Sequence, residues 1–372
     1  MTYVRYADYQ ETISADFDND LQVLLEEVVE ETENSVEKQH AKRAVRIAHG
    51  KSYGLVRATV TVHDGLPAKY AQGIYSSPGE YEAVIRYSNG LPHLRPDSQL
   101  GAACGMGIKL FGIPGPSLLE DERDATTFDY NLINNSTFFC NTARDYQTIM
   151  RLFIELPDAL LSPETRNKWM YNFLTRDGSL PPEKWLWDEY LTQMKMLGMS
   201  RQNLLTYSYW SMGAFRHGDY IAKIRVVPVD EDGRRVEATS LDLAADPEAF
   251  RNTLITDLTQ KDHQFDLQIQ LCKDLNVMPV STTSVDWPES VSEFVTVARI
   301  DIPRQDISGA DNLVVADGVS ITPWRVREAH KPLSEINLLR KEVYRQSSIL
   351  RHNINGQRRF EADTPDELWG RS

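Results

Sequence analysis

The sequence predicts an α+β fold in which helices surround a closed antiparallel β-barrel. Two observations predict it. Segments with the two-residue alternation of half-buried strands fall into two groups, and a long helical stretch separates them. This order, closed by a final helix, differs from the regular strand–helix alternation of parallel sheets. Because many half-buried strands would otherwise leave exposed edges, we expect the strands to close into a barrel.

The first group of predicted elements lies in the N-terminal third. Apolar residues recur at helical spacing over residues 18–33, with glutamates between them. Residues 57–62 and 82–87 alternate as strands do, and residues 107–111 are a third candidate strand. Several glycines between residues 101 and 115 indicate bends or close backbone approach.

Helical spacing and aromatic residues characterise the middle of the chain, over residues 144–199. Prolines interrupt this stretch at Pro157, Pro163, Pro181 and Pro182. Because proline removes a helical hydrogen bond, we expect these positions to divide the stretch into short helices.

Strand alternation then returns at residues 221–229, 265–271 and 294–302. A last helix is expected over residues 335–350, which would carry an apolar stripe. We therefore predict one domain over residues 1–372, with an N-terminal helical arm (1–40), a helical insertion (144–199) and the C-terminal helix (335–350).

Composition excludes several classes of protein. The 372 residues are 41% hydrophobic, which is enough for a sizeable core. The net charge of -14 disfavours nucleic acid and anionic membranes, because phosphates require clustered Lys and Arg. Three widely spaced cysteines, no apolar stretch of membrane-spanning length and no signal-peptide pattern indicate a cytoplasmic protein. A homo-oligomer is compatible with these features.

Two short motifs near opposite ends of the chain are candidates for chemistry. Residues 46–49 read Arg-Ile-Ala-His, and His49 is followed by a glycine and a strand. Residues 340–344 read Arg-Lys-Glu-Val-Tyr, which places Arg340 one helical turn before Tyr344. A histidine can move a peroxide's protons and a tyrosinate can hold ferric haem. The alternative interpretations are a surface or capping histidine and a surface cation–aromatic pair.

The order of the motifs along the chain resembles the haem catalase superfamily. Residues 46–51 (Arg-Ile-Ala-His-Gly-Lys) resemble the family's Arg-Val-Val-His-Ala-Lys, and residues 84–88 (Val-Ile-Arg-Tyr-Ser) its Val-Arg-Phe-Ser. Residues 104–110 resemble its Arg-Gly-Phe-Ala-Val-Lys-Phe, and residues 131–139 its Asp-Leu-Val-Gly-Asn-Asn-Thr-Pro-Ile-Phe-Phe. The C-terminal Arg-x-x-x-Tyr is similar to that of small catalase-related proteins. The resemblance covers about residues 20 to 356.

This resemblance implies a haem b cofactor (iron protoporphyrin IX) and assigns roles around it. Tyr344 is the implied proximal iron ligand, and Arg340 would donate to its phenolate oxygen. Arg46 and Arg86 match arginines that bind the haem propionates, a task that suits the guanidinium group. Their alternative interpretation is an ordinary surface salt bridge. The C-terminal helix would thus carry the proximal haem ligand.

Catalytic residues on the other haem face follow from the same resemblance. His49 is the implied proton shuttle, and Ser88 matches a serine that orients the imidazole. Asn134 or Asn135 matches the asparagine that hydrogen-bonds the bound peroxide; Asn134 is the preferred assignment, and a turn is the alternative. Tyr146 matches an aromatic residue stacked on the haem, or it is a helix core residue.

The resemblance predicts a haem catalase or peroxidase acting on hydrogen peroxide or an organic hydroperoxide. Ala48, Cys104 and Met106 depart from the family's residues and suggest a wider pocket. The first alternative is therefore an isomerase, dehydratase or lyase of lipid hydroperoxides, similar to coral allene oxide synthase. In that case the aromatic stretch 144–199 would wall an acyl channel rather than serve only as core. The second alternative is a haem carrier or sensor, which would need no proton shuttle.

Overall fold

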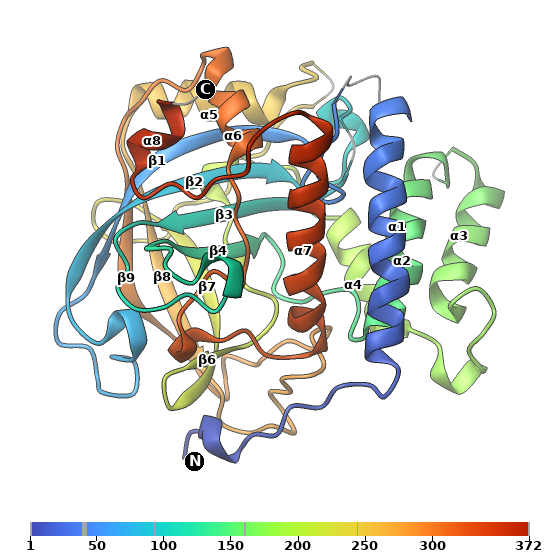
Figure 1. The fold of residues 1–372 in the computed structure, drawn as a ribbon, viewed down its shortest axis with the longest axis horizontal. Helices are drawn as coiled ribbons and strands as arrows, with labels where there is room; N and C mark the ends of the chain where they lie inside the picture. The colour runs from blue at the N-terminus through green and yellow to red at the C-terminus, as the bar shows by residue number, and fades with distance from the viewer. Residues whose placement is uncertain (1, 39–42, 93, 160, 244, 371–372) are drawn as a thin grey trace.

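A computed structural model describes residues 2–38, 43–92, 94–159, 161–243 and 245–370 (Figure 1). Residues 1, 39 and 40 of the predicted N-terminal arm lie outside the described residues. Within the described part of the chain, helices pack around one side and the top of a central β-structure in the view of Figure 1.

Nine strands of the described residues form a single antiparallel sheet. They are β1 (Ser52–Val62), β2 (Gly79–Asn89), β3 (Cys104–Leu110), β4 (Phe128–Ile133), β5 (Tyr209–Trp210), β6 (Phe215–His217), β7 (Tyr220–Val229), β8 (His263–Leu271) and β9 (Phe294–Ile302). The sheet order is β5-β4-β3-β2-β1-β9-β8-β7-β6, and β5 also pairs with β7. This extra pairing closes eight strands into a barrel and leaves β6 outside, which confirms the predicted closed barrel in an α+β fold.

Alternation of side chains explains the barrel core. In β1, Val56, Ala58, Val60 and Val62 are buried and belong to one apolar cluster inside the barrel. The alternating segment predicted at 294–302 coincides with β9. The strand at β4 was not predicted, because its sequence (Phe-Asp-Tyr-Asn-Leu-Ile) contains two polar residues that strand propensity disfavours.

Eight α-helices of the described residues complete the fold. They are α1 (Phe17–Lys38), α2 (Ala143–Ala159), α3 (Pro163–Thr175), α4 (Trp187–Leu197), α5 (Ala249–Gln260), α6 (Ala310–Gly318), α7 (Glu335–Ile354) and α8 (Pro365–Trp369). The predicted helices at 18–33 and 335–350 correspond to α1 and α7, and both extend a few residues further. The stretch is divided into short helices as predicted, but Pro157 does not interrupt one, because α2 continues through it to Ala159. Pro163 begins α3, where a proline costs no helical hydrogen bond.

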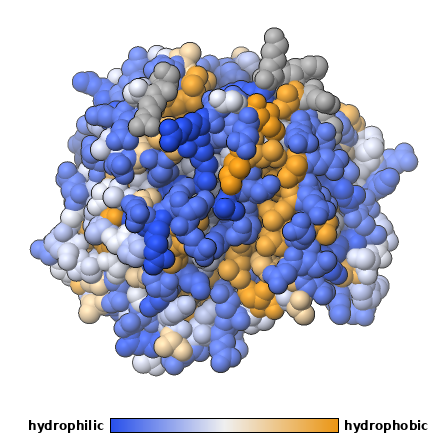
Figure 2. Space-filling view, viewed as in Figure 1, coloured by the Kyte–Doolittle hydropathy of each residue, from blue (hydrophilic) through white to orange (hydrophobic). Residues whose placement is uncertain are grey.

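A second apolar cluster joins the barrel to the helices on one side. Leu24 and Val28 of α1 pack in it with Leu339 and Val343 of α7. Figure 2 shows its surface edge as a band of hydrophobic residues where α1 and α7 run side by side. Helices α1, α2 and α7 therefore form a layer beside the barrel and separate the space between this layer and the barrel from solvent. In the part of the chain that the structure describes, no helix has both the length and the apolar character to cross a membrane.

Candidate active site

A large cavity lies between the outside of the barrel and the neighbouring helices. The segment 46–49, strands β2, β3 and β4, and helices α2, α4 and α7 all contribute to its walls. The cavity contains about 1870 Å³ of space that no atom fills, including its mouth to solvent. The fold thus brings the motif at residues 46–49 and the motif at residues 340–344 to the same cavity.

His49 stands at the barrel side of this cavity, in a backbone conformation that few residues adopt. Its φ is +57°, in the left-handed region, where histidine is less disfavoured than bulky residues. The Arg86 Nη2 donates to the His49 carbonyl at 3.0 Å and helps to hold this turn. The imidazole lies directly over Gly105 of β3, where a Cβ would be 2.6 Å from His49 Nδ1 and Cε1. Glycine at position 105 therefore makes room for the ring.

Ser88 and the local charges determine the state of the imidazole. The Nδ1 of His49 lies 3.1 Å from the Oγ of Ser88, so this nitrogen is engaged and Nε2 is left for a ligand. Burial, and to a smaller extent the positive charges of Arg86, Arg340 and Arg46, lower the pKa of His49 to about 3. The ring is therefore neutral at physiological pH and can accept a proton.

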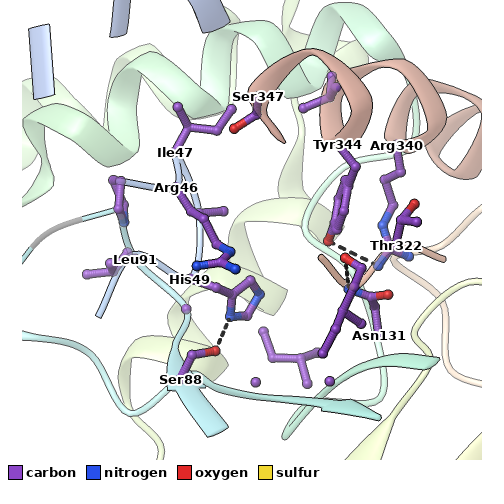
Figure 3. Close-up of a pocket in the computed structure, with 18 of the residues that line it drawn as sticks. Arg46, Ile47, His49, Ser88, Leu91, Asn131, Thr322, Arg340, Tyr344 and Ser347 are labelled. Atoms are coloured by element: carbon purple, nitrogen blue, oxygen red, sulfur yellow. Dashed lines mark hydrogen bonds between the residues drawn. The ribbon is translucent and has the colours of Figure 1, made fainter. Parts of the chain in front are cut away.

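Tyr344 and Arg340 approach the cavity from the opposite side, on α7 (Figure 3). The Arg340 Nη2 donates to the Tyr344 hydroxyl at 3.4 Å, and its guanidinium carbon lies 5.4 Å from the ring centroid. The other terminal nitrogen donates to Asn337 Oδ1 at 3.0 Å. Asn337 Nδ2 donates in turn to the Leu333 carbonyl at 2.7 Å. This chain of contacts fixes the buried guanidinium beside the phenol oxygen.

Positive charge gathers at one end of the cavity. Arg46 and Arg86 approach Asp317 Oδ1 at 3.9 and 3.8 Å, and Arg351 donates to the Asp317 carbonyl at 2.7 Å. Burial and the neighbouring arginines lower the pKa of Arg351 to about 8. Asp317 also pairs with the more exposed Arg43 at 2.6 Å. Three guanidinium groups therefore share one carboxylate, and Arg351 adds a fourth positive charge that only a backbone carbonyl contacts, which leaves a site suited to an anion.

The other predicted site residues are placed differently. Tyr146 of α2 lines the cavity, and its ring stacks on Phe138 with centroids 6.1 Å apart. Asn134 and Asn135 are buried but do not line the cavity. The Asn134 Oδ1 accepts from the Cys104 amide at 2.8 Å, and Asn135 Nδ2 donates to the Thr137 carbonyl at 2.8 Å. Both side chains are thus used to hold the turn after β4.

An asparagine that the sequence analysis passed over does line the cavity. Asn131 of β4 has a buried Oδ1 that no described group hydrogen-bonds, and its Nδ2 contacts the Ile321 carbonyl at 3.5 Å. Arg351 was also missed, although a signal was present. It follows Tyr344 by seven residues, or about two helical turns, so the two share a helix face. For Asn131 the only signal is strand alternation, which does not indicate which face meets the cavity.

The described residues of this cavity include no cluster of acidic, histidine or cysteine side chains that could coordinate a metal ion. Among the residues that the structure describes, no three His, Cys, Asp or Glu side chains are grouped to hold an ion. The three cysteines are buried and unpaired by disulfides. Tyr344 stands at the position predicted for an axial ligand, and a phenol is a ligand that haem iron accepts in proteins.

No family model and no curated protein sequence gives a significant match to this chain. Solved structures do match. A fungal catalase superposes with a TM-score of 0.65 at 13% identity, over 98% of this chain and 68% of the catalase. Catalase A from Saccharomyces cerevisiae gives 0.62 at 12% identity, over 98% and 71%. A bacterial catalase gives 0.59 at 10% identity, over 95% and 67%. The chain therefore has a catalase-like fold.

Proposed function

We propose that this protein is a haem-dependent oxidoreductase that cleaves the O–O bond of hydrogen peroxide or an organic hydroperoxide. The observation that carries the proposal is the placement of His49 and Tyr344 on opposite sides of one large cavity (Figure 3). A neutral imidazole supplies a proton shuttle, and a phenol beside a guanidinium supplies an axial ligand. The catalase-like fold supports the same assignment.

The residues of the cavity fit haem b, judged from their own chemistry. The guanidinium groups of Arg46 and Arg86 share the Asp317 carboxylate, and Arg351 contacts only the Asp317 backbone carbonyl, so two propionates would supply the missing negative charge. The Arg351 Nε is buried, and no described group accepts its hydrogen bond. Because an unpaired buried donor is costly, an acceptor is expected there. Tyr344, held by Arg340, would be the iron ligand.

Ferric haem, when bound, supplies the electron transfer that peroxide cleavage requires. The chain's own task is to move the protons. The His49 Nε2 can take the proton of one peroxide oxygen and deliver it to the other, since Ser88 engages only Nδ1. Asn131 also lines the cavity and has an unpartnered Oδ1, but it lies beside Arg340 and Tyr344 instead of beside His49 (Figure 3), so we assign it no contact with the peroxide.

The test is haem loading followed by peroxide turnover. We expect purified protein supplied with haem to show a Soret band and to consume hydrogen peroxide. Oxygen released in proportion to peroxide would indicate catalase chemistry, and peroxide loss without oxygen would indicate a peroxidase. A protein that binds no haem would refute the proposal. A His49→Ala variant that keeps both haem and full turnover would instead favour a carrier or sensor.

A second function on the same scaffold is isomerisation or dehydration of an organic hydroperoxide. The observation that favours it is Ala48, a small residue that precedes His49 and lines the cavity. Its short side chain leaves space beside the imidazole. A larger substrate can then reach the imidazole. Rearranged products formed without consumption of a reducing co-substrate would support this second function over peroxidase chemistry.

A further inference from the structure

The side of the cavity that α2 and α4 form is almost entirely apolar. Helix α2 supplies Tyr146, Met150 and Phe153, and helix α4 supplies Met196 and Leu197. The arginines and the lysine that line the cavity all come from other segments of the chain. Long apolar groups are favoured against such walls, and a charged group is not.

One polar side chain interrupts this apolar side. Gln193 of α4 lines the cavity, and only 2% of its surface is exposed. Its Oε1 is buried, and none of the described groups donates a hydrogen bond to it. A buried, unpaired amide oxygen costs about 1–3 kcal/mol, so it requires a partner. Because Gln193 lines the cavity, a molecule bound there can supply the partner.

The charges around Gln193 exclude an anion as that partner. Glu189 lies one helical turn earlier on the same face of α4, is buried, and accepts from Asn141 Nδ2 at 2.7 Å. The charged residues of α2 are directed elsewhere: Arg144 pairs with Asp20. A carboxylate at Gln193 would therefore meet another acid and no compensating cation.

We propose that Gln193 binds a hydroxyl or amide group of an uncharged, mainly apolar hydroperoxide whose –OOH group lies at His49. This inference rests on the proposed function and specifies its substrate class. A hydroxyl or an amide can both donate and accept, so it satisfies either orientation of the glutamine amide. The ionised fatty-acid hydroperoxides are disfavoured in this orientation, because α2 and α4 contribute no cation to the cavity wall that could pair with their carboxylate.

The experiment uses haem-loaded protein and three series of alkyl hydroperoxides of equal chain length. The three series differ only in the group at the chain end remote from –OOH: a methyl group in the first, a hydroxymethyl group in the second and a carboxylate in the third. We expect kcat/KM for the hydroxymethyl series to exceed that for the methyl series by about three- to tenfold, as for one neutral hydrogen bond. We expect the carboxylate series to be at least about tenfold poorer than the methyl series. The corresponding unreactive alcohols, titrated by calorimetry, should give dissociation constants in the same order.

Variants connect this preference to one side chain. Gln193→Leu should abolish the hydroxymethyl-to-methyl ratio, whereas Gln193→Asn, which keeps a neutral amide, should retain part of it. The matched control is Gln147→Leu, because Gln147 of α2 bonds Glu27 instead of lining the cavity. The control should retain the ratio of the parent protein.

Failure of this inference can be told apart from failure of the proposed function. No Soret band or no consumption of any hydroperoxide would overturn the proposed function. Haem-loaded protein that turns over all three series equally, or a Gln193→Leu variant with an unchanged ratio, would overturn the inference alone. In that case Gln193 would simply bind water.

Discussion

A methyl group at position 105 should damage the site by displacing the His49 imidazole and its partner Ser88. In a Gly105→Ala variant the new Cβ would lie 2.6 Å from two imidazole atoms and 3.0 Å from Ser88 Oγ. Ordinary contact needs about 3.4 Å or more, so the ring must move by close to 1 Å. A displacement of that size in a catalytic group can reduce the rate by about 100-fold. The added methyl should also destabilise the packed wall by about 1–3 kcal/mol.

The assay is peroxide consumption by haem-loaded protein, with haem content and thermal unfolding measured in parallel. Gly107→Ala is the matched control on the same strand, because its Cβ would meet the Ile321 side chain, at 3.1 Å from Cδ1 and 3.3 Å from Cγ2, and not His49 or Ser88. We expect Gly105→Ala to retain haem and lose about 100-fold in kcat/KM, and Gly107→Ala to lose far less. If Gly105→Ala consumed peroxide as fast as the parent, the imidazole of His49 would not be the proton shuttle.

Three further predictions concern the iron ligand, the charged end of the cavity and pH. Tyr344→Phe should lose haem or change its absorption spectrum, and an unchanged spectrum would exclude Tyr344 as the ligand. Arg351→Gln should weaken haem binding by about 10- to 100-fold, the effect of one charge-assisted hydrogen bond. The control Arg57→Gln, which breaks an exposed pair with Asp366, should leave haem affinity unchanged. Equal haem affinities of the Arg351→Gln variant and the parent protein would contradict the anion site. Because the folded pKa of His49 is about 3, kcat/KM should stay flat from pH 8 to 5, whereas a midpoint near about 6.5 would contradict a neutral buried ring. Between these two pKa values the unfolded chain binds a proton at His49 that the folded chain does not, so the free energy of unfolding should fall as pH falls, and less steeply in His49→Gln.

Periodicity in the sequence predicted the elements whose side chains alternate cleanly. Strand β9 and helix α7 lie where that pattern places them, and the strand–helix–strand order was sufficient to predict an α+β barrel. Strand β4 was missed, because Asp129 and Asn131 break its apolar pattern. The Asp129 carboxylate is fully buried and pairs with Lys109 at 2.9 Å, a partner twenty residues away. A buried ion pair is formed by tertiary contacts, and single-sequence propensity contains no information about it.

The candidate site shows the same limit. The sequence supplied His49 and Tyr344, but their positions 295 residues apart gave no distance between them. The structure brings both to one cavity and adds Arg351 and Gln193, which no motif marks. It also directs Asn134 toward the backbone and leaves Asn131 at the cavity wall. A one-residue change along a strand reverses the face that a side chain meets, so the assignment depends on the register of β4 against β3.

The sequence by itself determined the fold class and the two motifs to which we assign the proposed chemistry, because periodicity and side-chain type are local properties of the chain. The tertiary structure alone decided which polar groups face the cavity, how the arginines share Asp317, and why the imidazole of His49 stays neutral. These depend on burial and on charges contributed by distant segments, and both arise only when the barrel and the helices pack together.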